Sequence, residues 1–272
     1  MKNEVFNFQR FWNYFKYDFT QMWRGHVKAA VGIGLMGLIF YFLYNTFHLI
    51  LSKGDWQGPS LNARLFVFGL AGFALTLYVT RIYGYLTDRR KGSAWLMNPA
   101  STFEKWVSML IMTLIVIPCA FLGSSLLVDS VITLADPTVD KSIISSFQNI
   151  IKDINENLVS VNNDYMTTWS IGTFTGIGIA AECVELLYFL LCGITFRKYK
   201  ILGAFGIILG LSFIAPLVVS FMPIGSDAIS FDDPAAAEQY FRHIMTTATI
   251  IAWAIAACLA GGVFWRLKTL KH

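Results

Sequence analysis

Charged residues are scarce in this sequence. Asp, Glu, Lys and Arg make up 14% of its 272 residues, whereas a typical soluble domain carries about 25%. Hydrophobic residues make up 56%. A soluble fold of this size has too little polar surface to cover so much apolar material, but a lipid bilayer solvates it. The composition therefore predicts an integral membrane protein and argues against one or two soluble domains.

Cysteine pairs and enzyme signatures are also missing. The cysteines Cys119, Cys183, Cys192 and Cys258 all fall within apolar runs, and no CxxC occurs, so we expect no disulfide framework. The chain has no HExxH zinc motif, no GxSxG nucleophile elbow and no GxxxxGK[ST] phosphate loop. We therefore expect no catalytic residues, no metal site and no bound cofactor. The basic residues form short clusters between apolar runs, so nucleic acid is not an expected partner.

Six apolar runs are each long enough to cross a hydrocarbon core about 30 Å thick. They are Val27–Leu51, Leu65–Leu86, Trp106–Val128, Trp169–Phe196, Ile201–Met222 and Met245–Trp265. Residues 27–272 are therefore expected to form one all-α domain of six transmembrane helices, with no second, soluble domain.

The distribution of Lys and Arg predicts the orientation of these helices. If both termini lie in the cytoplasm, only five of the 21 basic residues fall in outer connections: Lys53, Arg64, Lys141, Lys152 and Arg242. The remaining sixteen then lie on the inner side, as the positive-inside rule requires. The chain is therefore expected to cross its membrane several times.

The first 26 residues are expected to form an amphipathic helix without a cleavable signal. Its apolar positions recur at helical spacing, at Phe8, Phe11, Trp12, Phe15, Phe19, Met22 and Trp23. Charged residues, including Arg10 and Asp18, are expected on the other faces. Such a helix suits the cytoplasmic interface of the membrane, either as an anchor or as a surface that holds a partner.

The longest outer connection follows the third apolar run. Within it, Ile143, Phe147, Ile150, Ile151, Ile154, Leu158 and Val161 form a helical stripe. We expect an amphipathic helix over about residues 139–161 on the outer surface. In the last outer connection, Pro234 is expected to begin a short helix that ends near Phe241.

Two carboxylates, Glu182 and Glu185, lie near the middle of the fourth apolar run. A charge at that depth costs about 2.5–3.5 kcal/mol, so such residues usually face the interior of the bundle. Their spacing places both on one helix face. They are either a polar pair on a transport route or a hydrogen-bonded pair that holds neighbouring helices together. A third reading places them in a watery vestibule beside an offset or broken helix.

The connection between the second and third runs is short and contains a helix start. Ser101 is followed three residues later by Glu104, the pattern of a capping box. The stretch from Trp95 to Lys105 resembles the "LPAS…EK" cytoplasmic loop of type-2 ABC exporter permeases, particularly small six-span members from Bacteroidetes-like bacteria. The end of the fourth run, from Phe189 to Lys200, resembles the same family, with a glycine before an aromatic-basic step.

The resemblance implies a division of labour with a second protein. Permeases of this family dimerise, with themselves or with a related permease, and sit on separate ATPase subunits that bind the ATP. The resemblance also implies that the chain is a multi-pass protein of a bacterial inner membrane. The loop would seat in a groove of the ATPase, through Trp95, Leu96, Pro99, Ser101, Glu104 and Lys105, and the N-terminal helix would brace it. The sequence departs from the family at Met97-Asn98, where a leucine usually precedes the proline, and in its long outer loop.

Two other functions stay open. An ion- or proton-coupled secondary transporter would use Glu182 and Glu185, although such carriers often contain internal repeats and none is visible in this sequence. A non-transporting membrane scaffold or accessory subunit would use the outer helix to bind a partner.

Overall fold

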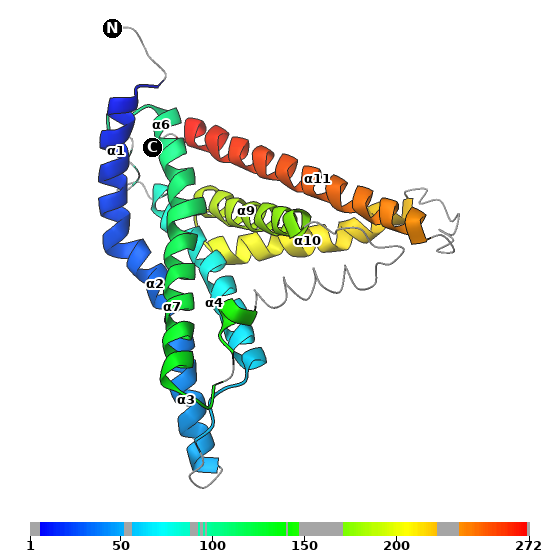
Figure 1. Ribbon diagram of the computed structural model, residues 1–272. Helices are drawn as coiled ribbons and strands as arrows, with labels where there is room; N and C mark the ends of the chain where they lie inside the picture. Colours follow the sequence, from blue (N-terminus) through cyan, green and yellow to red (C-terminus); the bar gives the residue numbers. More distant parts are fainter. Residues whose placement is uncertain are drawn as a thin grey trace.

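The computed structural model describes residues 6–51, 56–87, 92, 95, 97–139, 141–146, 171–221 and 234–270. Every regular element of these residues is helical (Figure 1), which confirms the all-α prediction. Five helical stretches are long and apolar enough to cross a membrane: Phe8–Leu51, Leu61–Thr87, Thr102–Ala135, Gly176–Thr195 and His243–Thr269. This architecture is consistent with a multi-pass membrane protein.

The first stretch is one long helical rod. It consists of α1 (Phe8–Met22), a π-helical turn η1 (Trp23–Val27), α2 (Lys28–Gly34) and α3 (Met36–Leu51). At 1.5 Å per residue, its 44 residues span about 66 Å, more than the about 40–45 Å of a whole bilayer. Part of the rod must therefore lie outside the hydrocarbon or bend along its surface. That α1 lies in the cytoplasmic interface stays a prediction.

The second and third stretches lie beside this rod. The second contains α4 (Leu61–Ile82) and a 3-10 turn η2 (Gly84–Thr87). The third contains α6 (Thr102–Ile111), a π-helical turn η3 (Met112–Val116) and α7 (Ile117–Ala135). Pro118 is the second residue after η3, and a proline inside a helix lacks an N–H and crowds the carbonyl four residues before it. The helix therefore widens at η3.

Three further helices lie in the described residues: α9 (Ile171–Thr195), α10 (Lys200–Phe221) and α11 (Pro234–Thr269). In Figure 1 they extend away from the α3–α4–α7 group, and the C-terminal end of α11 lies near α6. The helix that was expected to begin at Pro234 is continuous with the last span. The apolar stretch described in α10 covers Lys200–Gly210, which is shorter than a span requires, so the sixth span stays a prediction.

The connections predicted to lie inside meet at one end of the molecule. The Lys200 amino group donates hydrogen bonds to the Gly84 carbonyl and to Thr87 Oγ1. Arg266 donates to the Ile194 carbonyl over 3.4 Å. These bonds join the start of α10 to the end of the α4 stretch, and the end of α11 to the end of α9. The predicted inner connections therefore share one end, and which side of the membrane it faces stays a prediction.

The opposite end is held by the carboxylate of Asp136, which follows α7. It accepts hydrogen bonds from the Tyr41 hydroxyl (2.6 Å), from Trp56 Nε1 (2.8 Å) and from the hydroxyl and backbone N–H of Thr138 (2.6 and 2.9 Å). Burial alone would raise the pKa of this carboxyl, but these donors outweigh it and hold the pKa below its usual range. Beyond it a helical turn starts at Ile143, and most of the expected outer helix over 139–161 lies outside the described residues.

A close backbone contact joins α4 and α9. A Cβ atom built on Gly193 would lie 2.5 Å from the Thr80 carbonyl oxygen and 2.9 Å from the Thr80 Cα. Both atoms belong to the backbone of a packed helix, so neither can move aside cheaply. Glycine at this position therefore sets the distance between the two helices, in the way that small residues do in other membrane bundles.

We predict that Gly193→Ala destabilises the protein by about 1–3 kcal/mol, the usual cost of overpacking. Thermal unfolding of the detergent-purified chain measures this loss. Gly178→Ala is the matched control on the same helix, because a Cβ there meets nothing within 4 Å. Equal melting temperatures for the two variants would show that the α4–α9 distance is not set at Gly193.

We predict a pH-dependent contribution from Asp136. Because its folded pKa is depressed, its stabilisation is complete above the unfolded pKa of about 3.9 and is lost as the pH falls through the folded value. Asp136→Asn should lower the melting temperature at neutral pH and reduce the difference between neutral and strongly acidic conditions. A parallel loss in both proteins on acidification would assign the pH dependence to other groups.

Candidate functional site

The loop before α6 ends in a capping box, as the sequence predicted. The Ser101 hydroxyl accepts the Glu104 backbone N–H over 3.2 Å, and the Glu104 carboxylate accepts the Ser101 backbone N–H over 2.9 Å. Two N–H groups that a helix start leaves without intrahelical partners are thereby satisfied. The first turn of α6 is therefore firmly formed where the loop enters it.

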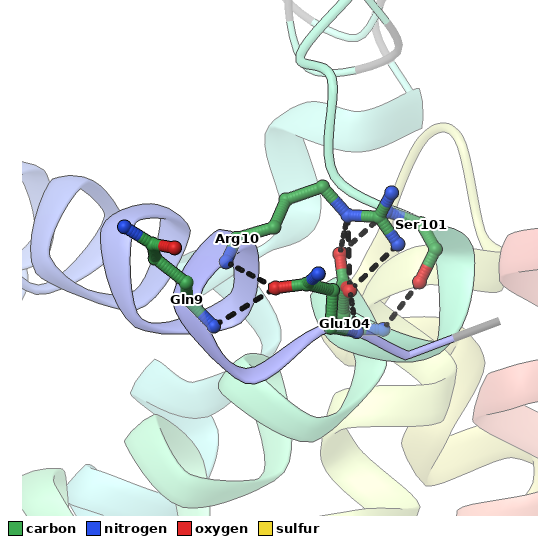
Figure 2. A network of polar contacts seen from close by, with 5 residues as sticks. Gln9, Arg10, Ser101 and Glu104 are labelled. Atoms are coloured by element: carbon green, nitrogen blue, oxygen red, sulfur yellow. Dashed lines mark hydrogen bonds and ion pairs between the residues drawn. The ribbon is translucent and has the colours of Figure 1, made fainter. Parts of the chain in front are cut away.

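The same carboxylate also holds the start of α1 (Figure 2). Glu104 accepts the backbone N–H of Asn7, the N-cap residue of α1, over 2.9 Å. Arg10 donates to both carboxylate oxygens, from Nε over 2.8 and 3.0 Å and from Nη2 over 2.8 Å. Negative charge is favourable at helix N-termini, and here one carboxylate serves two of them. Glu104 is 0% exposed.

A second set of contacts ties the loop to the middle of α1. The Trp95 indole N–H donates to the Tyr14 hydroxyl over 3.0 Å. The Lys105 amino group donates to the Trp95 carbonyl over 2.9 Å and lies 4.6 Å from the centre of its ring, a cation–π distance. All three residues are buried. The loop is therefore fastened to α1 at both of its ends.

A third contact uses a buried carboxylate farther along α1. Asp18 accepts hydrogen bonds from the Ser108 hydroxyl of α6 over 2.7 Å and from the Tyr83 hydroxyl over 2.9 Å. Asp18 is buried, as is Tyr83. Together with the contacts above, these residues form what we call the α1–α6 network, which comprises Asn7, Arg10, Tyr14, Asp18, Tyr83, Trp95, Ser101, Glu104, Lys105 and Ser108.

This network shows what the polar positions of α1 contact. Arg10 and Asp18 were expected on faces other than the aromatic one, and they point toward α6. Several aromatic side chains form a ladder along the helix, with adjacent ring centres 5.6–6.5 Å apart: Phe8, Trp12, Phe15, Phe19 and Trp23. Phe8, Trp12 and Trp23 are exposed, whereas Phe15 and Phe19 pack against the buried core. Both the polar and some of the aromatic positions of α1 therefore make internal contacts.

The residues expected to contact an ATPase fall into two groups. Trp95, Glu104 and Lys105 are buried, so they hold the loop in place and present little surface. Pro99 is exposed and Ser101 is half-buried, whereas Leu96 lies outside the described residues. Met97 is 83% exposed. Their contact with an ATPase stays a prediction.

An open groove runs between the loop and α1. It has a volume of about 700 Å³ and is lined by Asn7, Gln9, Arg10, Asn13, Tyr14, Tyr17, Asn98, Pro99 and Ala100. The lining is rich in carboxamides and phenols, which donate and accept hydrogen bonds without a net charge. The exposed part of the loop therefore borders a polar surface suited to another protein segment.

Two aromatic residues of α6 connect this region to α11. The Trp106 indole N–H donates to the Ala260 carbonyl over 3.0 Å, and its ring lies 5.6 Å from that of Phe264. Phe103 also contacts Phe264 edge-on, at 6.4 Å. Helix α6 therefore touches both the first and the last helices of the chain, and a displacement of its N-terminus would reach both.

The end of α9 and the turn after it are fixed against α4 and α10. Gly193 allows the close contact with Thr80, Phe196 packs beside Gly203 of α10, and Lys200 binds the end of the α4 stretch. The glycine, aromatic and basic positions noted in the sequence thus lock the turn between α9 and α10 against the end of α4. This explains why those residue types occur in that order.

Glu182 and Glu185 do not form an enclosed site. Glu182 is exposed and Glu185 is half-buried on α9. Within the described part of the chain, neither carboxylate has a hydrogen bond or an ion pair. The expectation that such residues face the interior of the bundle is therefore not met by Glu182 in the single chain. Whether the pair acts in transport or in packing stays a prediction.

Sequence reasoning missed the buried ionic groups at the ends of the helices. Asp18 was assigned to a polar face, and Arg64 and Asp129 were placed in outer connections, although they form a buried ion pair. The sequence contained a signal for the Arg64–Asp129 pair, because these opposite charges lie at the predicted outer ends of the second and third spans. No group of three or more potential metal ligands is found among the described residues.

Comparison with protein-family models, curated proteins and solved structures finds no match for this chain.

We predict that Arg10→Gln lowers the free energy of unfolding by about 1–3 kcal/mol. The reason is that Glu104 stays buried without its cationic partner, while the 38% exposure of the Arg10 side chain keeps the loss below that of a fully buried pair. Thermal or denaturant unfolding measures it. Arg24→Gln removes an exposed charge from the same rod and should change stability by less than about 0.5 kcal/mol.

A double variant tests the cause of that loss. Arg10→Gln with Glu104→Gln removes the buried charge and should recover part of the stability of the single variant. If the double variant is as unstable as the sum of the two single variants, the ion pair is not the origin of the effect.

Proposed function

We propose that the chain is the membrane-spanning permease subunit of an ABC-type exporter and is driven by a separate ATPase subunit. The observation that supports this best is the construction of the loop between the second and third helical stretches. Its buried residues fix it to α1 and α6, while Met97 and Pro99 stay exposed beside a polar groove. A loop held this way transmits a push to the helices better than a loosely attached one.

The contacts of α6 determine which helices a force on the loop would move. A force on the exposed loop acts on the N-terminus of α6, and through Glu104 on the start of α1. Trp106 carries it to α11. The chain has no phosphate-binding loop of its own, so the energy would have to come from the partner. A homodimer, or a pair with a related permease, would supply the second half of the transport path.

A secondary transporter is the other candidate, favoured by the exposure of Glu182 on α9. A carboxylate that faces lipid is costly, so it would require water, a cation or a proton at some stage of a cycle. In this case proton-driven flux in liposomes would occur without any ATPase and would be lost in Glu182→Gln. A non-transporting membrane scaffold or accessory subunit is the third candidate, and its partner would bind the long outer connection.

We predict that the full-length chain, purified from its native membrane, retains a P-loop ATPase. Met97→Asp should reduce the amount of recovered ATPase about tenfold. A charge buried in the contact is expected to cost about 1.4 kcal/mol of binding free energy, which corresponds to a tenfold weaker affinity. Lys141→Asp is the control, since Lys141 is exposed in a predicted outer connection. Mass spectrometry and ATP hydrolysis by the purified complex provide the measurement.

The outcomes separate the candidates. Equal recovery with both variants would refute the contact at the loop, and the absence of any ATPase would refute the permease proposal. ATPase-independent flux that requires Glu182 would establish the secondary transporter instead.

A further inference from the structure

A second polar cluster lies at the opposite end of the molecule from the α1–α6 network. Arg64, near the start of α4, forms an ion pair with Asp129 of α7, and their side chains are 5% and 6% exposed. Arg64 Nη2 also donates to the Lys141 carbonyl over 2.5 Å, and Asp129 Oδ2 accepts the Ile143 backbone N–H over 2.6 Å. Both charges are thus compensated, and the pair joins α4, α7 and the segment that follows α7.

Two buried polar atoms beside this pair have no hydrogen-bond partner in the described structure. They are Arg64 Nε and Ser125 Oγ, and their residues are 6% and 8% exposed. A buried donor or hydroxyl without a partner carries a substantial free-energy penalty. Such groups are rare in folded proteins, and an ordered water often satisfies them.

Both residues line the same small cavity between α2, α3, α4 and α7. Its volume is about 30 Å³, and Asp129 lines it as well. Apart from these three residues its walls are formed by glycine, alanine and large apolar side chains, including Phe40, Phe68 and Val128. A cavity needs roughly 10–15 Å³ of this kind of space to hold one water molecule, and the water needs two to four polar partners. The cavity meets both conditions.

We propose that this cavity is a binding site for one ordered water molecule. The water oxygen accepts the Arg64 Nε–H and bonds to the Ser125 hydroxyl, and one water hydrogen is available to the Asp129 carboxylate. The two unpartnered atoms and the ion pair then form one connected group. This group joins α4 to α7, and the first helical stretch only lines the cavity, with Gly34, Gly37 and Phe40.

The charges around the cavity favour water over an ion. Arg64 and Asp129 neutralise each other, so a halide would leave an uncompensated negative charge in an apolar enclosure. A metal cation would face the guanidinium group and would lack ligands, because Asp129 is the only carboxylate that lines the described cavity. A neutral molecule that accepts and donates hydrogen bonds adds no charge.

The sign of a stability change distinguishes a hydrated cavity from a dry one. If water is bound, Ser125→Ala removes one of its partners and should lower the melting temperature of the detergent-purified chain, by about 2–4 °C for a typical loss of one bond. If the cavity is dry, the same variant removes an unsatisfied hydroxyl and should raise the melting temperature or leave it unchanged, which overturns the proposal.

Thr113 provides the matched control. Its hydroxyl is also buried and unpartnered, but it lines neither cavity described above. Thr113→Val should therefore leave the melting temperature unchanged or raise it, and the opposite signs of the two variants support a water at Ser125 alone. Equal destabilisation by both variants would overturn the proposal, because loss of a hydroxyl would then be harmful without a cavity.

An experimental structure of the full chain gives the direct test. A density peak at hydrogen-bond distance from both Arg64 Nε and Ser125 Oγ, about 2.7–3.2 Å, with no anomalous signal when chloride is replaced by bromide, supports the water. An empty cavity, or an anomalous bromide peak inside it, overturns the proposal.

Discussion

The end of the molecule at which α1 and α6 begin depends on the contacts of the Glu104 carboxylate. This carboxylate closes the capping box of α6, accepts the N–H of the residue that caps α1, and binds the Arg10 guanidinium. Each bond alone is ordinary, but they share one fully buried group. Asn7 and Glu104, at the starts of the two helices, lie 97 residues apart in the chain. The two helix starts therefore cannot separate without leaving a charge in an apolar surrounding.

This constraint gives a physical reason for the position of the loop. Trp95 bonds to Tyr14 of α1 and Lys105 bonds to Trp95, whereas Met97 and Pro99 of the same loop stay exposed. A surface held from behind by buried hydrogen bonds keeps its shape when something presses on it. The same arrangement would serve a scaffold or a transporter, because it determines how the loop is held and leaves open what is bound.

The helical class, the capping box and the approximate ends of most spans were predictable from local patterns. Ser101 and Glu104 form a motif that is complete within four residues, and long apolar runs need no knowledge of their neighbours. The inward face of α1 was not predictable, because a tyrosine–aspartate–arginine stripe becomes internal only when α6 supplies Ser108 and Glu104. The Arg64–Asp129 pair likewise requires knowing that α4 and α7 are adjacent. Glu182 shows the opposite error, since its depth in an apolar run indicated burial that the packing does not provide.

The two π-helical turns lie in two neighbouring rods. η1 divides the first rod between α1 and α2, and η3 divides its neighbour between α6 and α7, with α1 beside α6 and α2 beside α7. Each wide turn accommodates one extra residue and so rotates everything before it by about 100° relative to a regular helix. The two rotations decide which face of α1 and which face of α6 point toward each other. A one-residue deletion in either turn would swing Arg10 or Glu104 around the axis of its own helix and separate the pair, and deletions in both turns would not restore it, because neighbouring rods that rotate in the same sense move their facing surfaces in opposite directions.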